Sequence, residues 1–460
     1  MKKIGKIARL YAIASLLCLT GQINKAVLPT TPPQPTSSQR VPTQQEPAQE
    51  EHTSAPLTLT QQKNGEHWII IAIHGTFGLD ECGSPPLIFT LFKDIIDGTI
   101  YKKRVCSMRG DCSRYHSQAM QEPGLIPIKL TDSPQTPAEL FAMLYDTVQQ
   151  AYYPERQATD YYTFGWSGLL NGRERFEEAI KLMKGIKGLV AIARAQGIET
   201  KIGILAYSHG ANVALDLTEV QRRALVPVDF VIDELSMLGP PVQRETDCYI
   251  NRPFIKKIYN FNSLVDRTCR LDCFSTSQFF SGRRFYDNAR CKVPDKLTQV
   301  ELRCSIPAAQ DQRRTYKSLK RIHYAPGHYE LWHFGWPGVN DSFRQYFPLV
   351  PLPAVLLIPA FTATLAQHLP AGRDCIFEIR PDNGTACLRK RHHSEKIIVP
   401  CIDPALLSKL KKQAWDFFYE HADQLLSRPK PPPEENPFRH PESARMRARS
   451  KQKKLQNSAF

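Results

Sequence analysis

The segment Lys201-Ile202-Gly203-Ile204-Leu205-Ala206-Tyr207-Ser208-His209-Gly210-Ala211 decides the fold. Residues 201–207 form a mainly apolar run, which is typical of a strand buried on both faces of a sheet. Residues 211–223 have the spacing of a helix. Ser208 is therefore expected on a sharp strand-to-helix turn, where the small residues Ala206 and Gly210 let the backbone pack tightly.

Strands and helices alternate on both sides of this segment. Apolar runs predict strands at residues 67–73, 160–166, 230–237, 255–261 and 319–323. Residues 173–196 have helical periodicity, and this helix is expected to end near Gly197. The pattern predicts an α/β fold with a mostly parallel central sheet covered by helices.

A second motif follows the first of these strands. His74-Gly75-Thr76-Phe77-Gly78 comes after residues 67–73, well before the serine turn. The two motifs in this order resemble the α/β-hydrolase superfamily, in particular its lipases and esterases, with Ala206 in place of the usual first glycine. The resemblance spans roughly residues 64–350.

The resemblance implies a catalytic serine and an oxyanion site. Ser208 matches the nucleophile of the superfamily. The backbone amides of Thr76 or Phe77, together with that of His209 at the helix start, are then expected to stabilise the oxyanion.

An acid and then a histidine should follow Ser208 in the chain. Asp266, in the loop after residues 258–263, is the expected acid, and Asp272 and Asp233 are alternatives. His328, in the tight loop after residues 319–323, is the expected base. His333 is a second choice for the base, and His323 is expected to lie on the strand itself.

Three further residues are candidates for substrate binding. Trp166 and Ser167 end another predicted strand at the same sheet edge, where they either line a pocket or pack internally; His74 belongs to the oxyanion motif. No metal or cofactor is expected, because the chain has no CxxC pair and a Pro-Gly break separates the clustered histidines.

Composition divides the chain into four parts. Residues 1–26 are a predicted signal peptide or short membrane anchor, with four basic residues before an apolar run. Residues 27–63 are a predicted disordered Pro/Thr/Gln-rich spacer, 64–427 the hydrolase-like domain, and 428–460 a disordered basic tail. The body of the protein is therefore expected outside the cytoplasm.

Charge and cysteines refine this view. The formal net charge is +15, and the tail has nine Lys and Arg residues against three Glu. This tail suits contact with an anionic membrane or cell surface, and no nucleic-acid partner is expected. Eleven of the 12 cysteines follow the signal, which favours disulfides. The sequence leaves the pairing open, but four locally spaced pairs are candidates: Cys106/Cys112, Cys269/Cys273, Cys291/Cys304 and Cys375/Cys387.

Two stretches depart from a minimal hydrolase. Residues 271–312 are basic and contain cysteines, so they are predicted to be an insertion between the acid and the histidine. Residues 347–365 are very apolar but interrupted by four prolines, which predicts a buried segment rather than a membrane span.

The expected function is that of an exported serine hydrolase that cleaves carboxylic ester or lipid substrates through an acyl-enzyme. A peptidase or thioesterase on the same fold stays open. The alternative from another class is a catalytically inactive α/β-hydrolase scaffold that binds at the cell envelope. Convergence of Ser208, His328 and Asp266 would distinguish the enzyme from the scaffold.

Overall fold

A computed structural model describes residues 66–77, 99–110, 112–156, 158–226, 228–266, 268, 281–310, 320–369, 372–391 and 393–427. The predicted signal (1–26), spacer (27–63) and basic tail (428–460) lie outside these residues, as do Asp272 and the pair Cys269/Cys273. The fold described here is that of the predicted 64–427 body.

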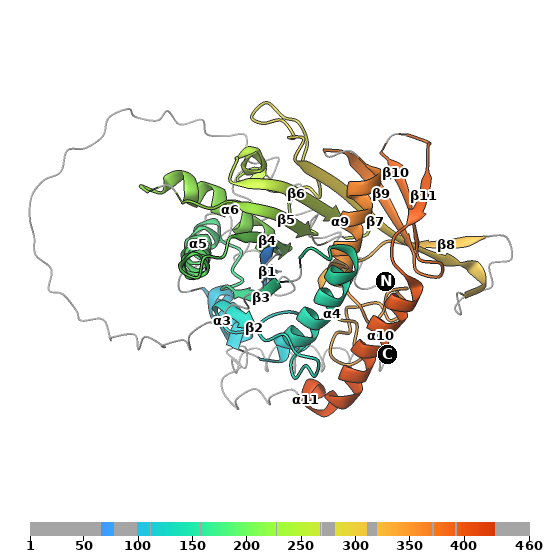
Figure 1. Cartoon of the computed structure of the whole chain (residues 1–460). Helices are drawn as coiled ribbons and strands as arrows, with labels where there is room; N and C mark the ends of the chain where they lie inside the picture. The colour runs from blue at the N-terminus through green and yellow to red at the C-terminus, as the bar shows by residue number, and fades with distance from the viewer. Residues whose placement is uncertain are drawn as a thin grey trace, which may run out of the picture. The chain divides into compact units, whose positions relative to one another are not determined.

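An 11-stranded mixed sheet is at the centre of this body (Figure 1). Its strands follow the order β11-β10-β9-β7-β6-β5-β4-β1-β3-β2, and β8 pairs with β7 outside this order. Neighbouring strands from β3 through β9 run parallel, and β2, β8, β10 and β11 are antiparallel to their neighbours. The strands are β1 (His67–Ile73), β2 (Gly124–Ile128), β3 (Ala158–Gly165), β4 (Thr200–Tyr207), β5 (Ile232–Leu238), β6 (Ile255–Asn262), β7 (Leu297–Pro307), β8 (Arg321–Tyr324), β9 (Asp374–Arg380), β10 (Thr385–Lys390) and β11 (Ile397–Pro400). The predicted α/β fold with a mostly parallel sheet is confirmed.

Helices cover both faces of the sheet. In Figure 1, α5 and α6 lie on one side, and α4, α9 and α10 lie on the other. The helices of the described residues are α3 (Ile100–Gly110), α4 (Pro137–Tyr152), α5 (Gly172–Ala195), α6 (Gly210–Arg223), α8 (His328–Trp332), α9 (Ile358–His368), α10 (Pro404–Glu420) and α11 (Ala422–Leu426). Short 3-10 turns form η2 (Cys112–Tyr115), η3 (Asp247–Asn251), η4 (Ala308–Gln310) and η5 (Ala354–Leu357).

Burial on both faces explains the continuous apolar run of β1. All seven of its residues are buried. Trp68 and Ile70 belong to the core that α4 and α9 share. Ile73 points to the opposite face, where it lies against Gly210 at the start of α6. Because side chains alternate along a strand, only a run that is apolar at every position fills both sides.

Side-chain caps begin the long helices. Thr136 Oγ1 accepts the Glu139 amide at 3.2 Å before α4, and Asn171 Oδ1 accepts the Glu174 amide at 2.9 Å before α5. These bonds satisfy amides that have no partner within the helix. Helix α5 ends next to Gly197, whose φ of 73° suits the left-handed conformation at a helix C-terminus.

Strand β7 lies inside the stretch 271–312 that composition assigns to an insertion. It pairs with β6 on one side and β9 on the other. Its buried positions include Gln299 and Glu301, which an apolar-run criterion does not recognise. Gln299 bonds to the Phe285 backbone, and Glu301 pairs with Arg303 and Arg391, so both polar groups are satisfied.

The described cysteines form no disulfide: Cys106, Cys248, Cys291, Cys304, Cys375, Cys387 and Cys401 are free thiols. Two of the predicted pairs are wrong. Cys375 is opposite Lys390 and Cys387 is opposite Glu378. The two cysteines are therefore offset by three residues, about 10 Å along the strands. Cys304 is buried within β7 and Cys291 lies beside Cys248, and both are free thiols. The Cys112 side chain lies outside the description.

The proline-interrupted stretch 347–365 is buried, as predicted. It forms η5 and most of α9, and Phe361 packs against Phe261 of β6 and Phe377 of β9. None of the helices in the described ranges combines the length and apolar character that crossing a membrane requires.

Candidate active site

Ser208 lies on a tight turn between β4 and α6. Its φ of 51° makes it the one described non-glycine residue with a left-handed backbone, a conformation that side chains rarely adopt. The turn is crowded on two sides: a Cβ on Gly75 would lie 2.9 Å from the Ser208 Cβ, and one on Gly210 would lie 2.4 Å from the His74 carbonyl oxygen. Glycine at both positions therefore lets the serine turn and the His74 turn meet.

Three predicted residues converge at this turn. His328 Nε2 lies 3.0 Å from Ser208 Oγ, and His328 Nδ1 lies 2.7 Å from Asp266 Oδ2. Because a carboxylate only accepts, Nδ1 carries the proton and Nε2 accepts from the serine hydroxyl. The geometry is that of a nucleophile, a base and an acid that orients the base.

Asp266 is held almost completely out of solvent. It is 1% exposed, and its other oxygen, Oδ1, accepts the Thr268 amide at 3.0 Å. Gly239, at the end of β5, makes room for the pair: a Cβ there would lie 2.9 Å from Asp266 Oδ2 and 3.1 Å from His328 Nδ1. Its φ of 58° also suits glycine.

Tyr207 holds His328 from the side of the nucleophile strand. Its ring lies 4.7 Å from the His328 ring and stacks on Trp332 at 5.4 Å. Its hydroxyl donates to the His328 carbonyl oxygen at 3.2 Å. Tyr207, directly before Ser208, thus orients the helix that carries His328.

Arg344 holds the loop before α8 against that helix. Arg344 donates to Glu330 Oε1 at 2.5 Å and to the Ala325 carbonyl oxygen at 2.6 Å. Glu330 is 1% exposed, and a charge so deeply buried requires this partner. The ion pair fixes the start of α8, which is where His328 lies.

The two amides predicted after Gly75 have different surroundings. The Phe77 amide donates to the Gly168 carbonyl oxygen at 3.3 Å. Within the described part of the chain, the Thr76 amide has no acceptor, and its buried Oγ1 has no partner either. Thr76 is therefore the better oxyanion donor of the two. His209 lies at the N-terminal end of α6, where the helix dipole favours negative charge.

His74 and Trp166 join the ends of β1 and β3. His74 Nδ1 donates to the Gly75 carbonyl oxygen at 2.7 Å, and Nε2 accepts the Trp166 amide at 3.1 Å. Trp166 Nε1 returns a bond to the His74 carbonyl oxygen at 2.7 Å. Burial, together with the nearby positive charge of Arg109, lowers the pKa of His74 to about 3. His74 is therefore neutral, and its hydrogen bonds hold the turn that contains Thr76.

Of the other predicted pocket residues, Trp166 is fully buried and packs internally. Ser167 is partly exposed, and its Oγ accepts the Leu169 amide at 3.4 Å. Ser167 thus remains the one of this pair that a substrate can reach.

The alternative acids and bases lie elsewhere. Asp233 is at the start of β5, where it accepts the Ile202 amide and pairs with Lys256. His323 lies on β8, as predicted, and pairs with Glu378 at 3.0 Å. His333 Nδ1 lies 3.0 Å from Ser117 Oγ. Among the described residues, Ser208 forms no hydrogen bond with Asp233, His323 or His333.

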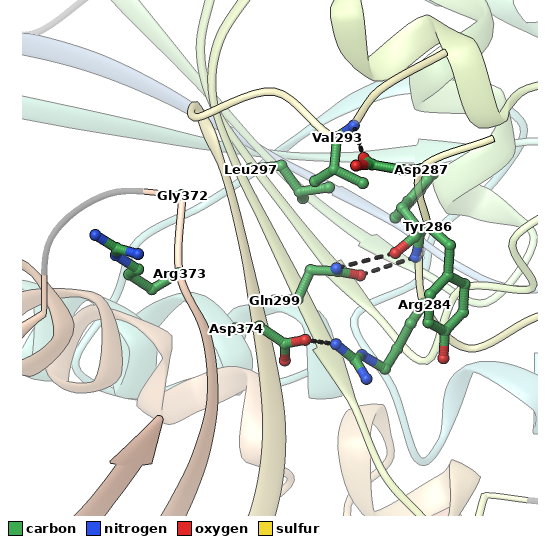
Figure 2. Close-up of a pocket in the computed structure, with 10 residues that line it drawn as sticks. Arg284, Tyr286, Asp287, Val293, Leu297, Gln299, Gly372, Arg373 and Asp374 are labelled. Carbon is green, nitrogen blue, oxygen red and sulfur yellow. Dashed lines mark hydrogen bonds and ion pairs between the residues drawn. The ribbon is translucent and has the colours of Figure 1, made fainter. Parts of the chain in front are cut away.

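A separate cavity of about 250 Å³ lies beside the starts of β7 and β9 (Figure 2). Figure 2 shows Arg284 facing Asp374, with which it forms an ion pair, while Arg373 points away from this group. Gln299 is bonded on both its amide atoms to Phe285. The polar groups of this cavity largely satisfy one another, and none of the converging triad residues lines it.

The chain matches no protein-family model and no curated protein sequence. The α/β fold and the geometry around Ser208 are therefore the observations from which a function has to be argued. Among the described residues, one group has the donor atoms for a metal, namely Asp247, Cys248 and Cys291, and it contains none of the triad residues.

Proposed function

We propose that the chain is a serine hydrolase that cleaves carboxylic ester bonds, including those of lipids. The observation that carries the proposal is the relay from Asp266 Oδ2 through His328 to Ser208 Oγ, with separations of 2.7 and 3.0 Å. These are the distances at which a histidine takes a proton from a serine and a carboxylate holds its tautomer.

The chemistry has two halves. Ser208 Oγ attacks the carbonyl carbon while its proton passes to His328 Nε2, and the resulting oxyanion accepts bonds from the amides of Thr76 and His209. Collapse expels the alcohol, which takes the proton from His328. Water then attacks the acyl-serine and gives a proton to His328. As the bond between the acyl group and Ser208 Oγ breaks, His328 returns that proton to Oγ, and the acid product leaves.

Strain at the nucleophile supports an enzyme over an ordinary turn. A left-handed serine costs on the order of 1–2 kcal/mol, and such strain gathers at functional sites. The strain is retained beside two donors on Thr76 that have no protein acceptor among the described residues. Together they favour a site that binds a negatively charged oxygen, as a tetrahedral intermediate requires.

The substrate class and location rest on the sequence. An export signal ahead of the body favours an enzyme that meets esters or lipids outside the cytoplasm, and the basic tail favours contact with an anionic membrane or cell surface. No cofactor enters the proposed reaction, since His328 makes every proton transfer it needs and Asp266 orients His328.

A fluorophosphonate probe tests the proposal directly, because it labels only an activated serine. The full-length protein should react at Ser208, and Ser208→Ala should abolish the labelling while leaving the unfolding temperature within a few degrees of the parent. Ser117→Ala is the matched control and should label like the parent. Lack of labelling in a folded parent would contradict the proposed hydrolase activity and favour the alternative of a catalytically inactive scaffold.

A further inference from the structure

A pair of cysteine thiols lies between η3 and the segment 281–296. Cys248 of η3 and Cys291 of that segment are both partly exposed, and their Sγ atoms lie within 4.8 Å of each other. Burial and hydrogen bonds to Cys291 and Asp247 raise the pKa of the Cys248 thiol to about 12. The thiols are thus in mutual contact, and solvent reaches both.

Backbone and side-chain bonds hold the two segments together around this pair. Val242, just before η3, exchanges two backbone hydrogen bonds with Gly282, at 2.7 and 3.0 Å. Arg290, next to Cys291, pairs with Asp247 at 2.6 Å, and Asn288 Nδ2 donates to Asp247 at 3.1 Å. The chain therefore brings the thiols together before any covalent bond forms.

The same bonds disfavour a metal at this position. Both carboxylate oxygens of Asp247 are already engaged, one by the Arg290 guanidinium and the other by Asn288. A zinc ion in a structural site has four ligands, and here it would meet two sulfurs beside a fixed positive charge. Two thiols without a free third ligand favour sulfur–sulfur bonding.

We propose that Cys248 and Cys291 form a disulfide by exchange with an external disulfide, such as oxidised glutathione or an oxidoreductase. Cys291 is the attacking sulfur, because it accepts a hydrogen bond from Asn288 at 3.7 Å and lies between Arg290 and Lys292. Its thiolate attacks one sulfur of the external disulfide and releases the other as a thiolate. Cys248 then loses its proton, attacks Cys291 and releases the second thiol. Two electrons and two protons pass from the pair to the external disulfide.

This disulfide would restrict the movement of segment 281–296, which holds the loop that carries Asp266. Arg283, in the same segment as Cys291, donates to the carbonyl oxygens of Ser263 and Leu264, in the loop that leads to Asp266. The bond also closes a chain loop of roughly 40 residues, which restricts the unfolded chain and raises stability. The inference concerns the thiols alone and does not depend on the proposed hydrolysis.

The test is peptide mapping of the full-length protein after treatment with oxidised glutathione. Trypsin should release residues 245–256 joined to residues 291–292 through a reducible bond. The oxidised protein should unfold roughly 5–10 °C above the reduced protein. Cys248→Ser and Cys291→Ser should each remove both effects, and Cys106→Ser, which removes an exposed thiol of α3, should keep both.

Three results would overturn the inference. The first is alkylation of both Cys248 and Cys291 after the oxidant treatment of the parent. The second is a bond from either residue to a different cysteine. The third is one equivalent of bound zinc in the purified parent that both serine variants lose. Mapping of the parent decides the question even where a variant fails to fold.

Discussion

Two serine–histidine pairs lie at the two ends of α8, and they have the same separation but different surroundings. Ser208 Oγ and His328 Nε2 are 3.0 Å apart, and so are Ser117 Oγ and His333 Nδ1. At the first pair, Asp266 holds the far nitrogen of the histidine at 2.7 Å. The charges that act on His333 come from His328 and Arg114, and neither is an acid.

The comparison teaches that contact between a serine and a histidine is not enough for a nucleophile. His328 Nδ1 donates to the Asp266 carboxylate, which orients the ring. At the second pair, burial together with nearby His328 and Arg114 lowers the pKa of His333 to about 3. Only the first serine lies on a left-handed turn at a helix start. The predictions below test whether these surroundings, rather than the contact distance, separate the two pairs.

The largest effect is expected from the replacement of His328, with the replacement of His333 as the matched control. His328→Gln should lower kcat/KM for a short-chain p-nitrophenyl ester by about 10⁴–10⁶-fold, because His328 acts first as general base and then as general acid. His333→Gln should change it by less than about tenfold. A large loss in His333→Gln with near-normal His328→Gln would reverse the assignment of the base.

Removal of the acid should make the first pair resemble the second. Asp266→Asn keeps the side-chain shape but lets His328 take the wrong tautomer, so kcat should fall by roughly 10³–10⁴-fold. Asp233→Asn is the control, because Asp233 lies at the start of β5 and bonds to Ile202 and Lys256. Equal activity of Asp266→Asn and the parent would show that Asp266 does not orient the base.

A smaller effect should follow from crowding the acid and base. Gly239→Ala places a Cβ 2.9 Å from Asp266 Oδ2 and 3.1 Å from His328 Nδ1, at a φ of 58°. We expect kcat to fall by roughly 10–100-fold, since small displacements of catalytic groups are costly. Gly188→Ala in α5 is the matched control, because a Cβ there meets nothing within 4 Å.

The smallest effect concerns stability in acid. The pKa of His333 is about 3 in the folded protein, below its ordinary value of 6.5. Protonation therefore favours the unfolded state, and the stability that neutral His333 contributes above pH 6.5 is lost as the pH falls toward 3. In His333→Gln, the slope of the unfolding free energy against pH should be shallower by up to about 1.4 kcal/mol per pH unit.

Urea unfolding at several pH values between 6.5 and 4 measures this slope. His393→Gln, which removes an exposed histidine, should leave the slope close to that of the parent. An unchanged slope in His333→Gln would mean that His333 does not remain neutral on folding, and the contrast with His328 would weaken.

The sequence predicts those elements whose structure follows from the residue pattern of a single segment. Continuous apolar runs locate β1, β4 and β6 because these strands are buried on both faces. The Ser208 turn can be recognised in the sequence because it needs small neighbouring residues. The order of Ser208, Asp266 and His328 was enough to select residues that the fold brings together.

Features that depend on distant partners were not predictable. The buried polar residues of β7 find partners in Phe285, Arg303 and Arg391, which no local pattern indicates. Arg344 contacts Glu330 and the Ala325 carbonyl oxygen, and Gly239 lies against Asp266 and His328. Neither these contacts nor the positive φ of Gly239 can be recognised in a single sequence. The pair Cys375/Cys387 failed for the same reason, because proximity in sequence does not imply proximity across extended strands.

The spacing of the site along the chain also affects when it can be assembled. Ser208 and His328 are separated by 120 residues. At ~5–20 residues per second, the ribosome makes the histidine roughly 6–24 s after the serine. A nascent chain therefore carries the serine turn for a considerable time without its base. Any hydrolytic activity would have to await the synthesis of α8, and the unfinished protein would be harmless to esters around it.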